Sequence, residues 1–170
     1  MLCNHSEETS QKTPMKMEFS IIAIAIHVIG AVVWVGGMFF AYTVLRPSLR
    51  SFEPSQRLTV WNDVFSNFFF WVWIIVIALP ASGYALVFNH LGGFGTAGIH
   101  VHIMHGIGLV MIALFVLLYF SPYRQFRDSV AAKDWASAAK HLNSIRRIVG
   151  INTILGLITV TVGASGRIWN

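Results

Sequence analysis

The chain has 170 residues, of which 55% are hydrophobic and 11% charged, and its mean hydropathy is +0.64. Soluble domains carry about 25% charged residues, so this composition excludes a disordered chain, a coiled coil and an ordinary soluble enzyme, and indicates one polytopic membrane domain. The net charge of +5 does not indicate nucleic acid, because the basic residues lie in connections between apolar segments, where membrane topology explains them.

Residues 1–18 are predicted to form a polar N-terminal tail. The tail lacks the basic-then-apolar pattern of a cleaved signal peptide. Its Cys3 is the single cysteine of the chain, so it can form neither an internal disulfide nor a Cys-x-x-Cys site. Met15 and Met17 directly precede the first apolar segment, and either is an alternative start of the protein.

Four apolar segments follow, at about residues 19–45, 64–88, 100–120 and 148–169. Each approaches or exceeds the roughly 20 residues that a helix needs to cross a bilayer. Pro80 lies inside the second segment, where a membrane helix tolerates it with a local kink. We therefore expect an all-α fold, an integral membrane four-helix bundle formed by residues 19–170.

The connections between the segments differ in charge. The first contains Arg46, Arg50 and Arg57, and the third contains Arg124, Arg127, Lys133, Lys140, Arg146 and Arg147. The second, residues 89–98, has no lysine or arginine. Because basic connections stay in the cytoplasm, the N- and C-termini and the second connection are predicted to lie outside, in the periplasm. Within the third connection, Asp134 is predicted to cap a surface helix that leads into the fourth segment.

His27 and His105 are the most informative side chains, since each lies inside an apolar segment. At 1.5 Å per residue they lie about 12 Å and about 8 Å from the outer ends of two segments that run in the same direction. An ionisable side chain at membrane depth is a functional candidate, because burial without a partner is costly. The alternative is two histidines bonded to backbone or water.

Small and flat residues share helical faces with these histidines. His27 shares a face with Gly30, Trp34 and Gly37, and His105 with Gly108. These faces allow close helix approach or leave room for a flat ligand. A stripe of small and polar residues on the fourth segment is expected to meet them inside the bundle: Asn152, Gly156, Thr159, Gly163 and Gly166.

A second group of metal-ligating side chains lies at the outer end of the third segment. It consists of His90, His100, His102, Met104 and His105. Imidazole suits copper, iron and zinc, and thioether sulfur suits Cu(I), so this cluster predicts capture of a metal ion from outside, with His27 as an inner ligand. The alternative is histidines that merely lie at the membrane interface.

Several stretches resemble the copper resistance protein D (CopD) family. These are HVIGAVVWVGGMFF from His27, LPASGYAL from Leu79, YFSPYRQFR from Tyr119 and RRIVGINTILGLITV from Arg146. The resemblance covers roughly residues 19–169. It implies a multi-pass protein of the bacterial inner membrane that handles copper by binding or uptake, with His27 as a functional residue.

A second resemblance is to the four-helix membrane protoporphyrinogen oxidase family of the HemJ type, which binds haem b. His27, Trp34, Gly37 and Phe39 are similar to its first helix. His105 lies roughly where that family has a functional lysine. This resemblance implies haem b with His27 and His105 as axial ligands, in electron transfer or porphyrin oxidation.

Three functions therefore remain open: copper handling, haem b-dependent oxidoreduction, and a cofactor-free subunit that supports a larger membrane complex. The sequence leaves copper and haem b undecided as cofactors, and it contains no protease, hydrolase, phosphate-binding or dinucleotide-binding motif. The expected partners are the lipid bilayer, a metal ion or haem, and a second copy or another membrane protein.

Overall fold

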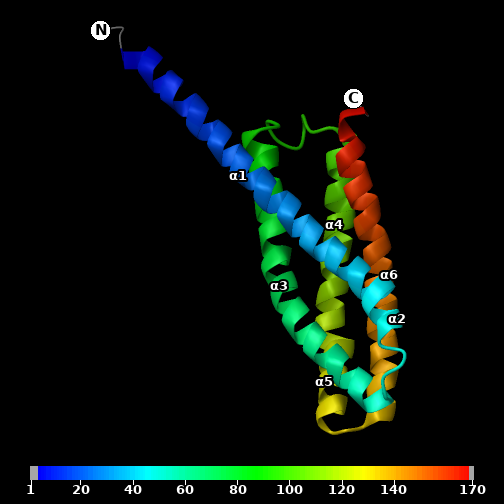
Figure 1. Ribbon diagram of the computed structural model, residues 1–170. Helices are drawn as coiled ribbons and strands as arrows, with labels where there is room; N and C mark the ends of the chain where they lie inside the picture. The colour runs from blue at the N-terminus through cyan, green and yellow to red at the C-terminus, as the bar shows by residue number, and fades with distance from the viewer. Residues whose placement is uncertain (1–3, 169–170) are drawn as a thin grey trace.

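The computed structural model describes residues 4–168, which form helices joined by short connections and contain no strand (Figure 1). Cys3 lies outside the described residues. The first long helix consists of α1 (Asn4–Phe40), a π-helical turn η1 (Ala41–Leu45) and α2 (Arg46–Ser48). The second is α3 (Pro54–Asn89).

The third and fourth long helices complete the bundle. The third consists of α4 (Ile99–Leu118), the π-helical turn η2 (Tyr119–Tyr123) and α5 (Arg124–Ala131). The fourth is α6 (Trp135–Ser165), which ends in a 3-10 turn, η3 (Gly166–Ile168). Within the described residues, four helices are long and apolar enough to cross a membrane. This confirms the predicted all-α, four-helix membrane architecture.

Two of the helices extend beyond the predicted membrane spans at the end of the bundle that carries the basic connections. The second helix begins at Pro54 rather than near residue 64, and the third continues to Ala131 rather than ending near residue 120. Hydropathy does not detect these extensions because they are amphipathic. They are helical because their apolar side chains, among them Leu58, Tyr123 and Phe126, are buried in the core.

Asp134 caps α6 as the sequence predicted. Its carboxylate accepts a hydrogen bond from the backbone N–H of Ser137 at 3.0 Å. Hydrogen bonds from the side chain and the backbone of Ser137 hold the pKa of the Asp134 carboxyl below its usual value. The predicted surface helix is thus the first part of α6 and continues into the fourth span without a break.

An aromatic core closes the end of the bundle near the basic connections. Phe69 lies at its centre, with ring centroids 5.3 Å from Phe65, 4.8 Å from Tyr123 and 5.7 Å from Phe115. These rings join α3 to α4, η2 and α5, and Phe126 is fully buried beside them. Stacked and edge-to-face contacts between these large rings hold α3, α4 and α5 together at this end of the bundle.

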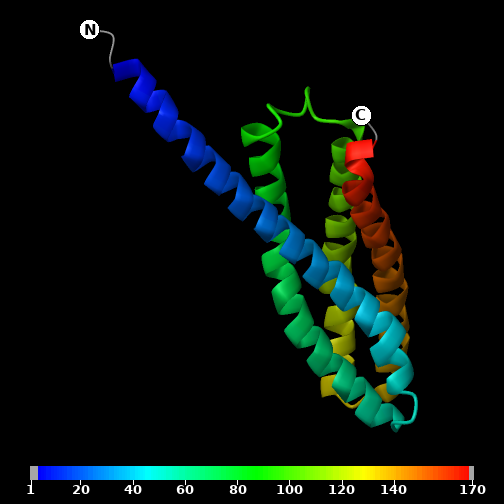
Figure 2. The ribbon, with the colours of Figure 1, turned by 45° about the horizontal axis from the view of Figure 1, so that its top comes forward.

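The opposite end is more open. α1 packs along α3 and crosses to α6, while α4 packs along α6. Figure 2 shows that α3 and α4 diverge toward their connection, which bridges the gap between them. Gly92 and Gly93 turn this connection with φ of 75° and 110°, values that favour glycine over residues with a Cβ atom. The divergence leaves room for a cavity between the helices.

Candidate functional site

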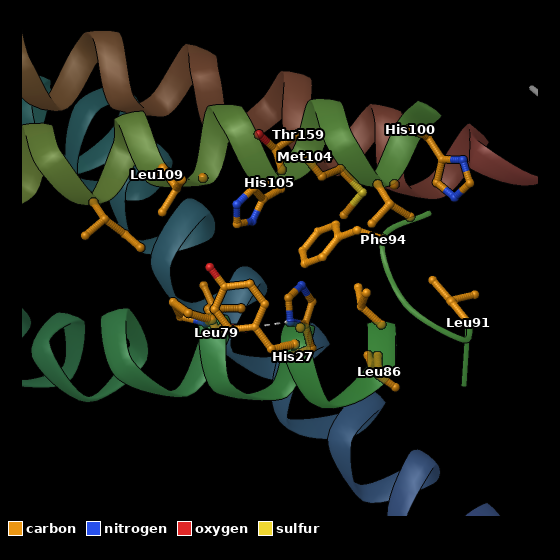
Figure 3. Close-up of a pocket in the computed structure, with 18 of the residues that line it drawn as sticks. His27, Leu79, Leu86, Leu91, Phe94, His100, Met104, His105, Leu109 and Thr159 are labelled. Atoms are coloured by element: carbon orange, nitrogen blue, oxygen red, sulfur yellow. Dashed lines mark hydrogen bonds between the residues drawn. The ribbon is translucent and has the colours of Figure 1, made fainter. Parts of the chain in front are cut away.

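A cavity of about 330 Å³ lies where α3 and α4 diverge, with α1 and α6 contributing to its walls (Figure 3). Its walls are mainly apolar and include Leu79, Leu86 and Ile112. Leu91 and Phe94 of the α3–α4 connection lie over it. Small-molecule sites are typically mainly apolar cavities of about 300–1,000 Å³ with a few polar groups, so this cavity is the candidate site.

His27 of α1 is the best-positioned polar group in the cavity wall. Its Nδ1 atom lies 3.1 Å from the carbonyl oxygen of Leu79 and 3.0 Å from Ser82 Oγ. A carbonyl oxygen only accepts hydrogen bonds, so Nδ1 carries the ring proton and donates to it. The Ser82 hydroxyl donates to the Ala78 carbonyl oxygen at 2.7 Å, which leaves its oxygen free to accept from Nδ1.

These hydrogen bonds of Nδ1 determine the state of the other ring nitrogen of His27, Nε2. With the proton on Nδ1, His27 Nε2 has a free lone pair, and it faces the cavity (Figure 3). Histidines that bind metals usually donate their other N–H to a carbonyl, carboxylate or water, which fixes the tautomer and the ring orientation. His27 therefore has the hydrogen bonding of a metal ligand.

The segment Leu79–Leu86, which resembles the CopD family, supplies these contacts. A Cβ atom on Gly83 would lie 3.2 Å from His27 Cε1, so glycine allows the imidazole to approach α3 closely. The segment stands out in the sequence by its family resemblance, but the contacts of Leu79, Ser82 and Gly83 with His27 could not be predicted from it. The one feature of the sequence that pointed to a contact here was the pair Ser82 and Gly83, a polar and a small residue inside an apolar helix.

His105 of α4 lies across the cavity from His27 (Figure 3). Its imidazole contacts two aromatic rings, with centroids 5.5 Å from Tyr84 and 5.3 Å from Phe94, and these two rings contact each other at 6.1 Å. These contacts join α3, α4 and their connection. The structure thus brings the two predicted histidines to the walls of one cavity.

Met104 and His100 also line the cavity and lie close to α6. A Cβ atom on Gly163 would lie 3.2 Å from Met104 Sδ, and one on Gly166 would lie 2.5 Å from His100 Cδ2. His100 Nδ1 is buried and has no hydrogen-bond partner. The small residues of the fourth helix therefore face α4 and position two potential ligands.

The remaining members of the predicted outer cluster lie apart from the cavity walls. His102 is exposed and contacts Phe94, with ring centroids 5.9 Å apart, and His90 is exposed at the C-terminal end of α3. Among the described residues, no three histidine, cysteine, aspartate or glutamate side chains are close enough together to hold a metal ion. The five-residue outer cluster is therefore not assembled as a single metal centre.

The four other candidate residues divide into two pairs. Trp34 and Gly108 line the cavity, and a Cβ atom on Gly108 would meet no atom within 4 Å. Gly30 and Gly37 lie instead where α1 contacts α3, against Leu79 and Phe68 respectively. Gly30 and Gly37 bring α1 and α3 together, whereas Gly108 leaves space in the cavity beside Trp34.

One protein family matches most of the chain that follows α1. The model of the family "Copper resistance protein D" matches residues 62–165, which include His100, Met104 and His105 but begin after His27. No curated protein and no solved structure matches the chain. Because the family model covers more than half of the sequence, the chain belongs to the copper resistance protein D (CopD) family.

Proposed function

We propose that this protein binds copper as Cu(I) in the cavity between α3 and α4, as part of copper handling at the bacterial inner membrane. The ligands are His27 Nε2, Met104 Sδ and the imidazole of His105. The observation that carries the proposal is the hydrogen bonding of His27 Nδ1 to Leu79 and Ser82, which directs the free Nε2 lone pair into the cavity.

The chemistry of the donors favours Cu(I) over a divalent ion. Imidazole suits several transition metals, whereas thioether sulfur favours Cu(I). No carboxylate lines the cavity, so its protein donors are all neutral. A monovalent ion loses less hydration free energy than a divalent one on entering such an apolar site.

The outer surface supplies a path to the cavity. His102 is exposed beside Phe94, and His100 lies in the wall with its Nδ1 free of hydrogen bonds. Copper arriving from outside would meet these imidazoles at the start of α4 before it reached His105 and His27. His90 lies away from the walls and is not a ligand in this proposal.

A Cu(I) titration against a chelator of known affinity tests the proposal on the full-length protein in detergent. We expect one copper per chain, and affinity lower by more than about tenfold after His27→Ala, because losing a ligand costs at least as much as losing the partner that orients it. His90→Ala is the matched control, because it removes an exposed imidazole outside the cavity. Equal affinity in the wild type and His27→Ala would contradict the proposal.

The absorption spectrum of the same sample, oxidised and reduced, separates the other two functions. A Soret band with iron near one per chain would favour haem b held by His27 and His105. A sample that binds neither copper nor haem after reconstitution would favour the cofactor-free structural subunit.

A further inference from the structure

Three arginines lie close together at the end of the bundle opposite the copper cavity. Arg46 follows η1, Arg57 lies in the first part of α3, and Arg146 lies on α6. Arg46 and Arg57 are near enough to Arg146 to repel it electrostatically. None of the three has an acidic partner, because the ion pair found among the described side chains joins Arg127 to Asp128.

Aromatic rings hold two of these guanidinium groups in place. The Arg46 guanidinium carbon lies 5.2 Å from the centroid of the Tyr42 ring, and that of Arg146 lies 5.6 Å from the Trp61 ring. Tyr42 packs in turn on α6, where a Cβ atom on Gly150 would lie 3.2 Å from its ring. The positive charges are thus fixed by cation–π contacts rather than by neutralisation.

Two buried hydrogen-bond donors lack partners beside these charges. Trp61 is only 3% exposed, and its Nε1–H makes no hydrogen bond. Arg146 Nε is also buried without a partner. Both residues line a small cavity of about 20 Å³, together with Arg46 and Tyr42. An unsatisfied buried donor costs about 1–3 kcal/mol, so an acceptor placed here would stabilise the arrangement.

The tendency of basic residues to lie on the cytoplasmic side explains how many arginines are present here. It does not explain why uncompensated guanidinium groups surround two buried N–H groups without acceptors. An anionic ligand with oxygen acceptors explains both features, because it neutralises the repulsion and accepts from the donors.

We propose that this arginine site binds the phosphate group of an anionic phospholipid. One phosphate oxygen enters the small cavity and accepts hydrogen bonds from Trp61 and Arg146, and the rest of the phosphate lies near Arg46 and Arg57.

The size and position of the cavity favour a lipid over a free anion. A volume of about 20 Å³ holds one water-sized atom, so most of the phosphate group remains at the surface. Tyr42, which lines the cavity, is 39% exposed and belongs to a helix long and apolar enough to cross a membrane. Basic sites between membrane helices on the cytoplasmic side bind the headgroups of such lipids.

Thermal unfolding of the full-length protein in neutral detergent, titrated with phosphatidylglycerol, tests this proposal. We expect saturable stabilisation with phosphatidylglycerol, and an affinity about tenfold lower after Arg146→Gln, because a hydrogen bond to a charged group is lost. Arg147→Gln is the matched control, since Arg147 is the adjacent, exposed arginine and should leave the affinity unchanged. Equal affinities of the wild type and Arg146→Gln would overturn the proposal.

Trp61→Phe gives a second test that retains an aromatic ring beneath Arg146 but removes Nε1–H. We expect it to fold and to bind phosphatidylglycerol more weakly than the wild type, and unchanged binding would overturn the role given to Trp61. A third test repeats the thermal unfolding titration with inorganic phosphate in place of phosphatidylglycerol. Equal stabilisation by inorganic phosphate, lost in Arg146→Gln, would show that the site takes soluble phosphate and overturn the assignment to a lipid.

Discussion

At the scale of single residues, His27 shows how one tautomer prepares a site. Its Nδ1–H is occupied by the Leu79 carbonyl and the Ser82 hydroxyl, so the lone pair of Nε2 remains for a ligand in the cavity. His105 and Met104 complete a neutral donor set on α4. Because these donors are imidazoles and a thioether, copper handling is the function proposed among the three that the sequence left open.

The hydrogen bond from His27 to Ser82 gives a prediction at this scale. In Ser82→Ala, His27 keeps its bond to Leu79 but loses one of two constraints on the ring, so we expect the affinity for Cu(I) to fall about tenfold. Competition titration measures the change. Ser129→Ala is the control, since the half-buried Ser129 hydroxyl lies outside the cavity and bonds only the carbonyl of Gln125 in its own helix. The same affinity in Ser82→Ala and Ser129→Ala would refute this role of Ser82.

At the scale of the helices, glycines determine how closely the bundle packs and where it stays open. Gly37 brings α1 against Phe68 of α3, and Gly156 brings α6 against Val35 and Met111. Gly108, in contrast, has open space beside it and lines the cavity. On the predicted small-residue faces, some glycines therefore allow helices to pack closely, and Gly108 leaves room for a ligand.

Gly156→Ala is predicted to destabilise the bundle. A Cβ atom at this buried position would lie 2.8 Å from Val35 Cγ2, on a short side chain that cannot move aside without shifting α1. Overpacking of this kind costs about 1–3 kcal/mol, and a lower midpoint of thermal unfolding in detergent would report it.

Gly36→Ala serves as the control for that substitution, because a Cβ atom on Gly36 meets nothing within 4 Å. Alanine also has the higher helix propensity, by about 1 kcal/mol, so the control is expected to be neutral or stabilising. If both variants unfolded at the wild-type temperature, Gly156 would not be a tight helix contact.

At the scale of the whole molecule, the two ends of the bundle differ in the side chains that fill them. The aromatic core around Phe69 closes the end with the basic connections, and the cavity with His27 lies at the other. The basic connections favour a cytoplasmic location for the closed end. In this orientation the cavity proposed to bind copper would open toward the outside, and the proposed arginine site would lie at the inner leaflet.

This orientation predicts the labelling of introduced cysteines. In a Cys3→Ser background, Gly95→Cys in the α3–α4 connection should react with a membrane-impermeant maleimide on spheroplasts. Ser51→Cys in the first connection should react only after the membrane is permeabilised. The reverse pattern would place the cavity on the cytoplasmic side and contradict capture of copper from outside.

Much of the architecture could be predicted from the sequence, because it depends on local properties. Hydropathy identified four membrane helices, and the Asp134 cap depends on hydrogen bonds over three residues. The contact of His27 with Ser82 joins positions 55 residues apart, so no local pattern could reveal it. The amphipathic extensions of α3 and of the third helix were missed because tertiary packing stabilises them.

The central claim is that Cu(I) is bound by histidine nitrogen and methionine sulfur inside the cavity. X-ray absorption at the copper edge of the Cu(I)-loaded full-length protein tests it most directly. We predict imidazole nitrogens and one sulfur around copper, with the sulfur lost in Met104→Leu and nitrogen lost in His27→Ala. A copper environment without sulfur, unchanged in both variants, would contradict the account.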